Sequence, residues 1–192
     1  MNNELRGSIL HLIESQPVLK QGRKAEMAEI LSLNSDCGGV IPEWLIELMT
    51  NYPLCGAQFG WESPDLDEDD VEEDIKGLSW TSYLLHLAKK DSYPLLAWVD
   101  WSTPAGMREV MLETYIGIEL LKHGYINVAH DGSSSDPYFV PIDCGDNPPL
   151  FAVSVCAPAD PDLIMKEELF LVSETLSEFF LKIKKVEIVC SP

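Results

Sequence analysis

The chain has 192 residues, of which 46% are apolar, and its 32 Asp and Glu against 13 Lys and Arg give a net charge of −19. A chain of this length builds one good core, because two domains of half the size would each bury too little apolar surface. The charge repels phosphate backbones and anionic lipid surfaces, which argues against direct binding of nucleic acid or membrane. It either favours a basic partner or simply keeps the protein in solution.

Hydropathy and cysteine spacing point to one compartment. No apolar run reaches the ~18 residues of a membrane helix, and Glu4 stands ahead of the first short apolar stretch, so we expect neither a membrane span nor a signal peptide. The five cysteines are odd in number, scattered and without a CxxC pair, which predicts neither a disulfide framework nor a zinc site. We therefore expect a cytoplasmic protein with reduced thiols.

The first 61 residues predict short helices and then a strand. Apolar residues recur at helical spacing over 5–13, and a second short helix is predicted over 25–31. A clearer helix begins at Pro42, which suits the first helical position, and it carries one apolar stripe from Leu45 to Tyr52. After Pro53 the aromatics of 53–61 are typical of a strand interrupted by glycine.

An acidic block follows Trp61. Nine of the 13 residues from Glu62 to Asp74 are acidic, and such a block repels itself, so we predict a solvated loop inserted at 62–74. A tryptophan flanked by carboxylates suits the basic patch of a partner protein, although a buried strand-end tryptophan is the plainer interpretation. The candidate partner-binding residues are Trp61, Asp65, Asp67, Glu68, Asp69, Asp70, Glu72, Glu73 and Asp74.

The second half of the chain predicts a meander framed by helices. A short helix is predicted over 78–87 and a buried strand over 94–101. Thr103 followed by proline is a helix start, and an apolar stripe predicts one helix as far as Leu121. Three short runs then predict consecutive antiparallel strands, and Thr175 with Glu178 forms a capping box for a closing helix. The runs are 125–130, 137–142 and 149–155. This order of elements predicts an α+β fold with a single domain over 1–192.

The amino-acid sequence of four of these segments resembles the SUKH superfamily, over roughly 41–181. The matching segments are IPEWLIELMTNY, GYINVAHDGSSSDPYFVPI, PLFAVSV and LVSETLSEFFL. The resemblance implies a central, mostly antiparallel sheet packed against several helices. It also implies a protein-binding role, because the superfamily groups yeast cell-wall synthesis regulators with bacterial immunity proteins that neutralise toxins, often nucleases.

The family's Asp-Gly turn matches Asp131-Gly132 together with Asp136 and Tyr138. Turn chemistry accounts for these residue types, so we interpret them as structural. His130 next to Asp131 invites a general-base interpretation, but neighbours on a strand point to opposite faces, so we predict a strand-end histidine without a catalytic role. Cys37 and Cys55 lack a basic neighbour and are interpreted as inert thiols.

Catalytic motifs are absent from the sequence. It contains no P-loop, GxGxxG, HExxH or GxSxG pattern, and the acidic run lacks the glycine and ligand spacing of an EF-hand. We therefore predict a non-enzymatic domain without catalytic residues, metal or cofactor. The leading hypothesis, which rests on the resemblance, is an immunity protein that neutralises a cognate basic toxin domain such as a nuclease. The alternatives are a regulatory interaction module in cell-wall synthesis or signalling, and an enzyme of unrecognised class.

Overall fold

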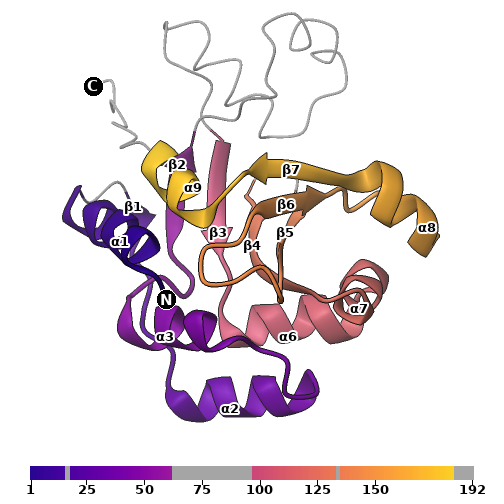
Figure 1. The fold of residues 1–192 in the computed structure, drawn as a ribbon, viewed down its shortest axis with the longest axis horizontal. Helices are drawn as coiled ribbons and strands as arrows, with labels where there is room; N and C mark the ends of the chain where they lie inside the picture. Colours follow the sequence, from indigo (N-terminus) through magenta and orange to yellow (C-terminus); the bar gives the residue numbers. More distant parts are fainter. Residues whose placement is uncertain (16–17, 62–96, 133–134, 184–192) are drawn as a thin grey trace, which may run out of the picture.

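Each strand of the protein pairs with the strand that follows it along the chain. In the computed structural model, which describes residues 1–15, 18–61, 97–132 and 135–183, seven strands form one antiparallel sheet in the order β1 to β7 (Figure 1). The strands are β1 (Val18–Lys20), β2 (Gln58–Trp61), β3 (Ala97–Trp101), β4 (Tyr125–Asp131), β5 (Pro137–Pro141), β6 (Leu150–Val153) and β7 (Leu169–Ser173). The chain is a single α+β domain, as predicted.

Helices precede, interrupt and close this meander. They are α1 (Asn3–Ser15), α2 (Met27–Asp36), α3 (Glu43–Asn51), α6 (Pro104–Glu113), α7 (Tyr115–Lys122), α8 (Pro161–Leu163) with a π-helical turn at Ile164–Glu168, and α9 (Leu176–Lys182). Side-chain caps start several of them. Thr103 accepts a hydrogen bond from the backbone N–H of Gly106 at 3.1 Å, and Thr175 accepts one from Glu178 at 3.2 Å.

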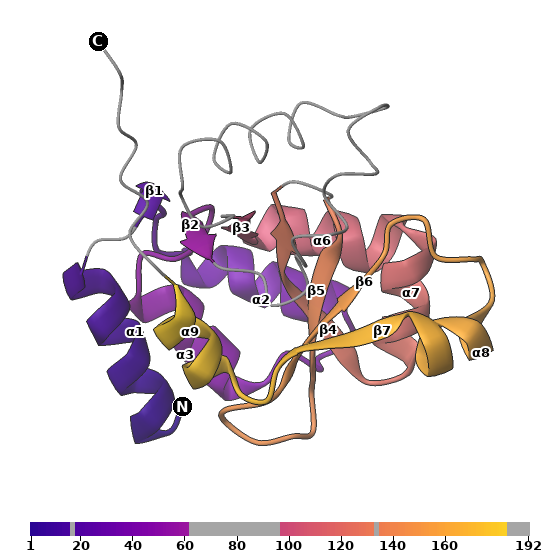
Figure 2. The same ribbon diagram turned by 90° about the horizontal axis from the view of Figure 1, so that it is seen from above.

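The two faces of the sheet are covered by different helices. Trp101 packs on Phe180 of α9 with ring centroids 5.2 Å apart, and Tyr138 meets Phe179 edge-on at 6.5 Å. Successive strand residues point to opposite faces, so Asp100 lies on the other face, where α6 and α7 pack on β4. Figure 2 shows α1 and α9 side by side, away from α6 and α7.

The single helix predicted to run on to Leu121 is divided at Thr114, which is extended (φ −100°, ψ 147°). Its Oγ1 donates to the carbonyl oxygen of Val110 at 2.7 Å and accepts from the backbone N–H of Gly117 at 3.0 Å. One hydroxyl thereby serves the end of α6 and the start of α7. The prediction was wrong because helical spacing alone does not show that a threonine can cap a second helix.

Other boundaries also shift. The matched segment 171–181 begins in β7 and becomes helical only at Leu176, and the helix predicted over 25–31 runs from Met27 to Asp36. Pro42 is the N-cap of α3 and not its first residue. The three predicted antiparallel strands are confirmed as β4, β5 and β6. The predicted helix 78–87 and the first residues of the 94–101 strand lie outside the described residues.

Most of the apolar stripes reach the core as predicted. Leu5, Ile9 and Leu12 of α1 and Phe179 and Phe180 of α9 are buried. None of the helices that the structure describes is both long enough and apolar enough to cross a bilayer.

Candidate functional site

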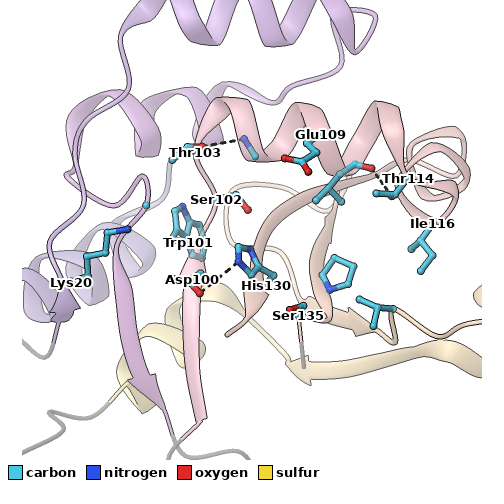
Figure 3. Close-up of a pocket in the computed structure, with 15 residues that line it drawn as sticks. Lys20, Asp100, Trp101, Ser102, Thr103, Glu109, Thr114, Ile116, His130 and Ser135 are labelled. Carbon is cyan, nitrogen blue, oxygen red and sulfur yellow. Dashed lines mark hydrogen bonds and ion pairs between the residues drawn. The ribbon is translucent and has the colours of Figure 1, made fainter. Parts of the chain in front are cut away.

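A pocket of about 580 Å³ opens on the α6 face of the sheet, above the first turns of that helix (Figure 3). Its sheet side is formed by Asp100, which is on β3, and His130, which is on β4. Its helix side is formed by Thr103, Gly106 and Glu109, which lie at or near the start of α6. Residues from the β4–β5 turn and from the segment after β6 complete the rim. The pocket thus joins strand and helix residues far apart in sequence.

Strand register explains why these polar groups meet. Lys20 pairs with Gln58, Gln58 with Asp100, and Asp100 with His130, across β1, β2, β3 and β4. Directly opposed residues of antiparallel strands share a face, so this row points away from α9. Lys20 and the Asp100–His130 pair consequently line one pocket from three different strands.

Asp100 and His130 form the central pair of the pocket. Asp100 Oδ2 lies 3.6 Å from His130 Nε2, and the two side chains are 20% and 41% exposed. This separation is longer than a hydrogen bond but short enough for an ion pair once the ring is protonated. The Asp100 carboxylate is thus largely shielded from water, and no Lys or Arg that the structure describes forms an ion pair with it.

A buried polar pair supports the sheet beneath the pocket. Ser102 Oγ donates to Asn127 Oδ1 at 2.9 Å, and Asn127 Nδ2 donates to the carbonyl oxygens of Ala129 and Tyr138 at 2.9 and 3.0 Å. Asn127 is fully buried, and the β4–β5 register shifts between it and Ala129. This amide satisfies backbone groups at the irregularity between β4 and β5, and its bond from Ser102 ties the residue after β3 to β4.

Three of the hydroxyl groups around the pocket are already engaged in hydrogen bonds. Ser102 donates to Asn127, Thr103 caps α6, and Thr114 bonds both Val110 and Gly117. A nucleophilic hydroxyl needs a base within hydrogen-bond reach, and none of these three side chains bonds to His130. The arrangement therefore offers two carboxylates and a histidine, a set suited to holding a cation, and does not assemble a nucleophile–base pair from these hydroxyls.

The Asp-Gly turn contributes to the fold as predicted. Asp136 Oδ1 accepts from the backbone N–H of Val155 at 2.7 Å, which ties the turn to the segment after β6. Tyr138 Oη donates to Asp131 Oδ2 at 3.4 Å. His130 lines the pocket while Asp131 contacts Tyr138, so the two neighbours do not act together, which agrees with the alternation argument.

Of the partner-binding candidates from the sequence, Trp61 alone lies within the described residues. It is the last residue of β2 and pairs with Ala97 of β3. The acidic candidates Asp65, Asp67, Glu68, Asp69, Asp70, Glu72, Glu73 and Asp74 lie outside the described residues. The acidic surface therefore stays a prediction from the sequence.

Sequence reasoning missed Asp100, Glu109 and Lys20 as pocket residues. A signal for Asp100 is present, because it is the lone charge in the apolar run PLLAWVDW, and a charge within a buried strand needs a reason. Glu109 looks like any solvated helix residue, and Lys20 sits on a strand that was not predicted. Their meeting depends on the pairing of β1 to β4, which the sequence does not display.

The cysteines agree with the prediction of inert thiols at two positions. Cys37 and Cys55 are buried, and burial raises the pKa of both, that of Cys55 to about 11. Cys144 and Cys156 are exposed. Across the ranges that the structure describes, no group of three or more His, Cys, Asp or Glu is arranged to hold a metal ion.

Comparison with protein-family models, with curated proteins and with solved structures finds no match to this chain. The resemblance to the SUKH superfamily therefore stays a prediction from the sequence. The features of the molecule that bear on function are its charges and the pocket described above.

Proposed function

We propose that this protein is a non-enzymatic binding domain that holds a basic protein, acting as an immunity protein against a toxin domain. The observation that carries the proposal is the net charge of the described residues. The described residues include 21 Asp and Glu against eight Lys and Arg. An imbalance of this size gives a negative field that attracts a basic partner and raises the rate of encounter.

Most of the described Lys and Arg side chains form ion pairs within the molecule. Five of those eight Lys and Arg already form ion pairs with carboxylates of the same molecule. They are Arg6 with Glu47, Arg23 with Glu29, Arg108 with Asp36, Lys122 with Glu119 and Lys166 with Asp162. The pairing leaves the net charge unchanged, and it leaves 16 of the described carboxylates against three Lys, so the charge open to a partner is almost entirely negative.

The acidic run adds to this field. Its nine carboxylates in 13 residues follow directly on β2, and exposed charges attract a partner over a Debye length, ~8 Å at physiological ionic strength. We therefore expect the run to act mainly on the association rate. The antiparallel sheet with its covering helices agrees with the fold that the resemblance implies. Because regulators and immunity proteins of the superfamily share that fold, it is the acidic charge that supports an immunity role against a basic toxin domain.

The test searches the genes beside that of this protein for a basic toxin domain and expresses that domain for binding. Wild-type protein should bind it with one-to-one stoichiometry in calorimetry and should restore growth of cells that express the toxin. Protein that neither binds nor protects would overturn the proposal. Binding to a set of wall-synthesis or signalling proteins, without protection, would favour the regulatory alternative.

A salt series separates steering from contact. The variant Asp67→Asn, Glu68→Gln, Asp69→Asn and Asp70→Asn should associate several-fold more slowly at low salt, with little change in dissociation rate. The matched control removes four scattered carboxylates: Glu14→Gln, Glu113→Gln, Asp160→Asn and Glu178→Gln. If both variants associate equally fast, only total charge matters and the run has no special part.

A further inference from the structure

We propose that the pocket between α6 and the sheet takes one cationic side chain, an arginine or a lysine, from the basic partner. This inference rests on the proposed function and adds a defined contact to it. Two carboxylates approach the same space from different elements, Asp100 from β3 and Glu109 from α6. Figure 3 shows the Glu109 carboxylate directed from the helix towards the side on which Asp100 and His130 lie.

No Lys or Arg of the described residues forms an ion pair with either carboxylate. Within the same part of the chain Asp100 has only His130 within ion-pair distance, and Glu109 has no ion-pair partner. Other carboxylates of the fold, such as those bonded by Arg23 and Arg108, are already paired. An incoming guanidinium or ammonium group would therefore meet two open acceptors in a space partly shielded from water, where charge pairs are stronger than at an open surface.

The remaining walls suit the aliphatic part of such a side chain. Val110, Ile116, Pro137 and Val155 contribute apolar surface around the polar groups. Val155 is 49% exposed, so its side chain is open to contact from a side chain that enters the pocket. Long cationic side chains bury their methylene stems on apolar surface and keep the charged head at polar groups, and this pocket offers both.

Lys20 fixes where the cation can sit. It lies at the β1 end of the row, two strands from Asp100, a separation of ~10 Å between backbones. Its ammonium group repels a second cation, so the head group belongs at the Glu109 side of Asp100. This predicts opposite effects for two kinds of variant, since removing a carboxylate weakens binding and removing Lys20 strengthens it.

The first experiment titrates the full chain with n-butylguanidinium, which carries one charge and an aliphatic stem, and follows the His130 ring and the Gly106 amide by NMR. Both signals should shift on saturation. Asp100→Asn and Glu109→Gln should each weaken binding about three- to tenfold, and Lys20→Gln should tighten it. Glu113→Gln, one helical turn beyond Glu109 and outside the pocket lining, is the control and should bind as wild type. If neither NMR signal shifts, or if Glu109→Gln and Glu113→Gln lose the same affinity, the pocket does not bind the cation and the proposal is overturned.

The second experiment separates this inference from the proposed function. Given a basic partner that binds wild-type protein, Asp100→Asn and Glu109→Gln should weaken that complex, and n-butylguanidinium should compete with it. A partner that binds both variants as tightly as wild type would overturn the pocket contact and leave the proposed function standing. If butylguanidinium binds but no basic protein does, the proposed function fails, and the inference fails with it because the pocket would then hold a small free cation and not a side chain of a protein.

Discussion

An ideal Cβ on Gly117 would lie 1.8 Å from the carbonyl oxygen of Val110, so α7 reaches its place beside α6 only with glycine at that position. The close approach follows from Thr114, whose hydroxyl bonds both residues. The corner between α6 and α7 therefore depends on one small residue and one cap. That corner also sets the direction of α6, which forms one wall of the pocket.

Gly117→Ala should lower the free energy of unfolding by about 2 kcal/mol, because the backbone has to move to admit the methyl group. Gly7 is the matched control, since it is exposed within α1 and an added Cβ meets nothing within 4 Å. Gly7→Ala should stabilise the protein by about 0.5–1 kcal/mol through helix propensity. Urea unfolding followed by circular dichroism gives both values, and equal midpoints for the two variants would contradict the close approach.

The Ser102–Asn127 pair should be costly to break. Ser102→Ala removes the donor to a fully buried amide oxygen, and an unsatisfied buried acceptor costs about 1–3 kcal/mol. Ser154→Ala is the control, because its hydroxyl accepts only an exposed hydrogen bond from Cys156, and it should change stability by about 0.5 kcal/mol or less. Indistinguishable unfolding curves for the two variants would show that the amide oxygen finds another partner.

The stability of the protein should fall at low pH as Glu29 becomes protonated. Hydrogen bonds from Arg23, at 2.6 and 2.7 Å, and from the backbone N–H of Glu26 lower the pKa of Glu29 to about 2. A pKa lowered by folding contributes stability that is complete above the unfolded value of ~4.3 and is lost as the pH falls through about 2.

Glu29→Gln keeps an acceptor for the Glu26 backbone but removes the charge. Its urea midpoint should lie below that of wild type at pH 7, and the gap should close as the pH falls from about 4.3 towards 2. Glu113→Gln, with no ion pair in the structure, serves as the control at each pH. A gap independent of pH would mean that the charge of Glu29 adds nothing to stability.

Thiol reactivity should follow burial. Iodoacetamide at pH 8 should modify Cys144 and Cys156 within minutes, since both are exposed. Cys37 and Cys55 should react only after urea is added, because burial both blocks access and raises the pKa of each thiol, which leaves little thiolate. Peptide mass mapping reads each site separately, and native labelling of Cys55 would show that the region around Met49 opens readily.

The sequence was most informative where one face of an element is buried. Apolar runs bounded by turn residues predicted β4, β5 and β6, and helical stripes predicted α1, α3 and α9. It failed at β7, an edge strand whose Phe170 and Leu171 are both exposed, so no alternation between core and solvent marks it. Apolar patterns in the sequence therefore predict the elements that contribute a buried face to the core, and they miss an edge strand whose apolar side chains are exposed.

The pocket could not be predicted for a different reason. Asp100 and His130 are each visible in the sequence, but their encounter depends on the register between β3 and β4. A shift of one residue would send His130 to the opposite face. Local patterns indicate which residues are strand residues and do not indicate which of them face each other.

The pairing of Trp61 with Ala97 places the two ends of the 35-residue stretch 62–96 on adjacent strands, as the ends of a hairpin connection. The entropy of closing a connection grows by only about 0.6 kcal/mol for each doubling of its length, so by this effect alone replacing 62–96 with a four-residue turn should alter stability by only ~2 kcal/mol. Ten of the 32 carboxylates lie in that stretch. Almost a third of the acidic charge can therefore be removed or exchanged without changing a residue of the paired strands.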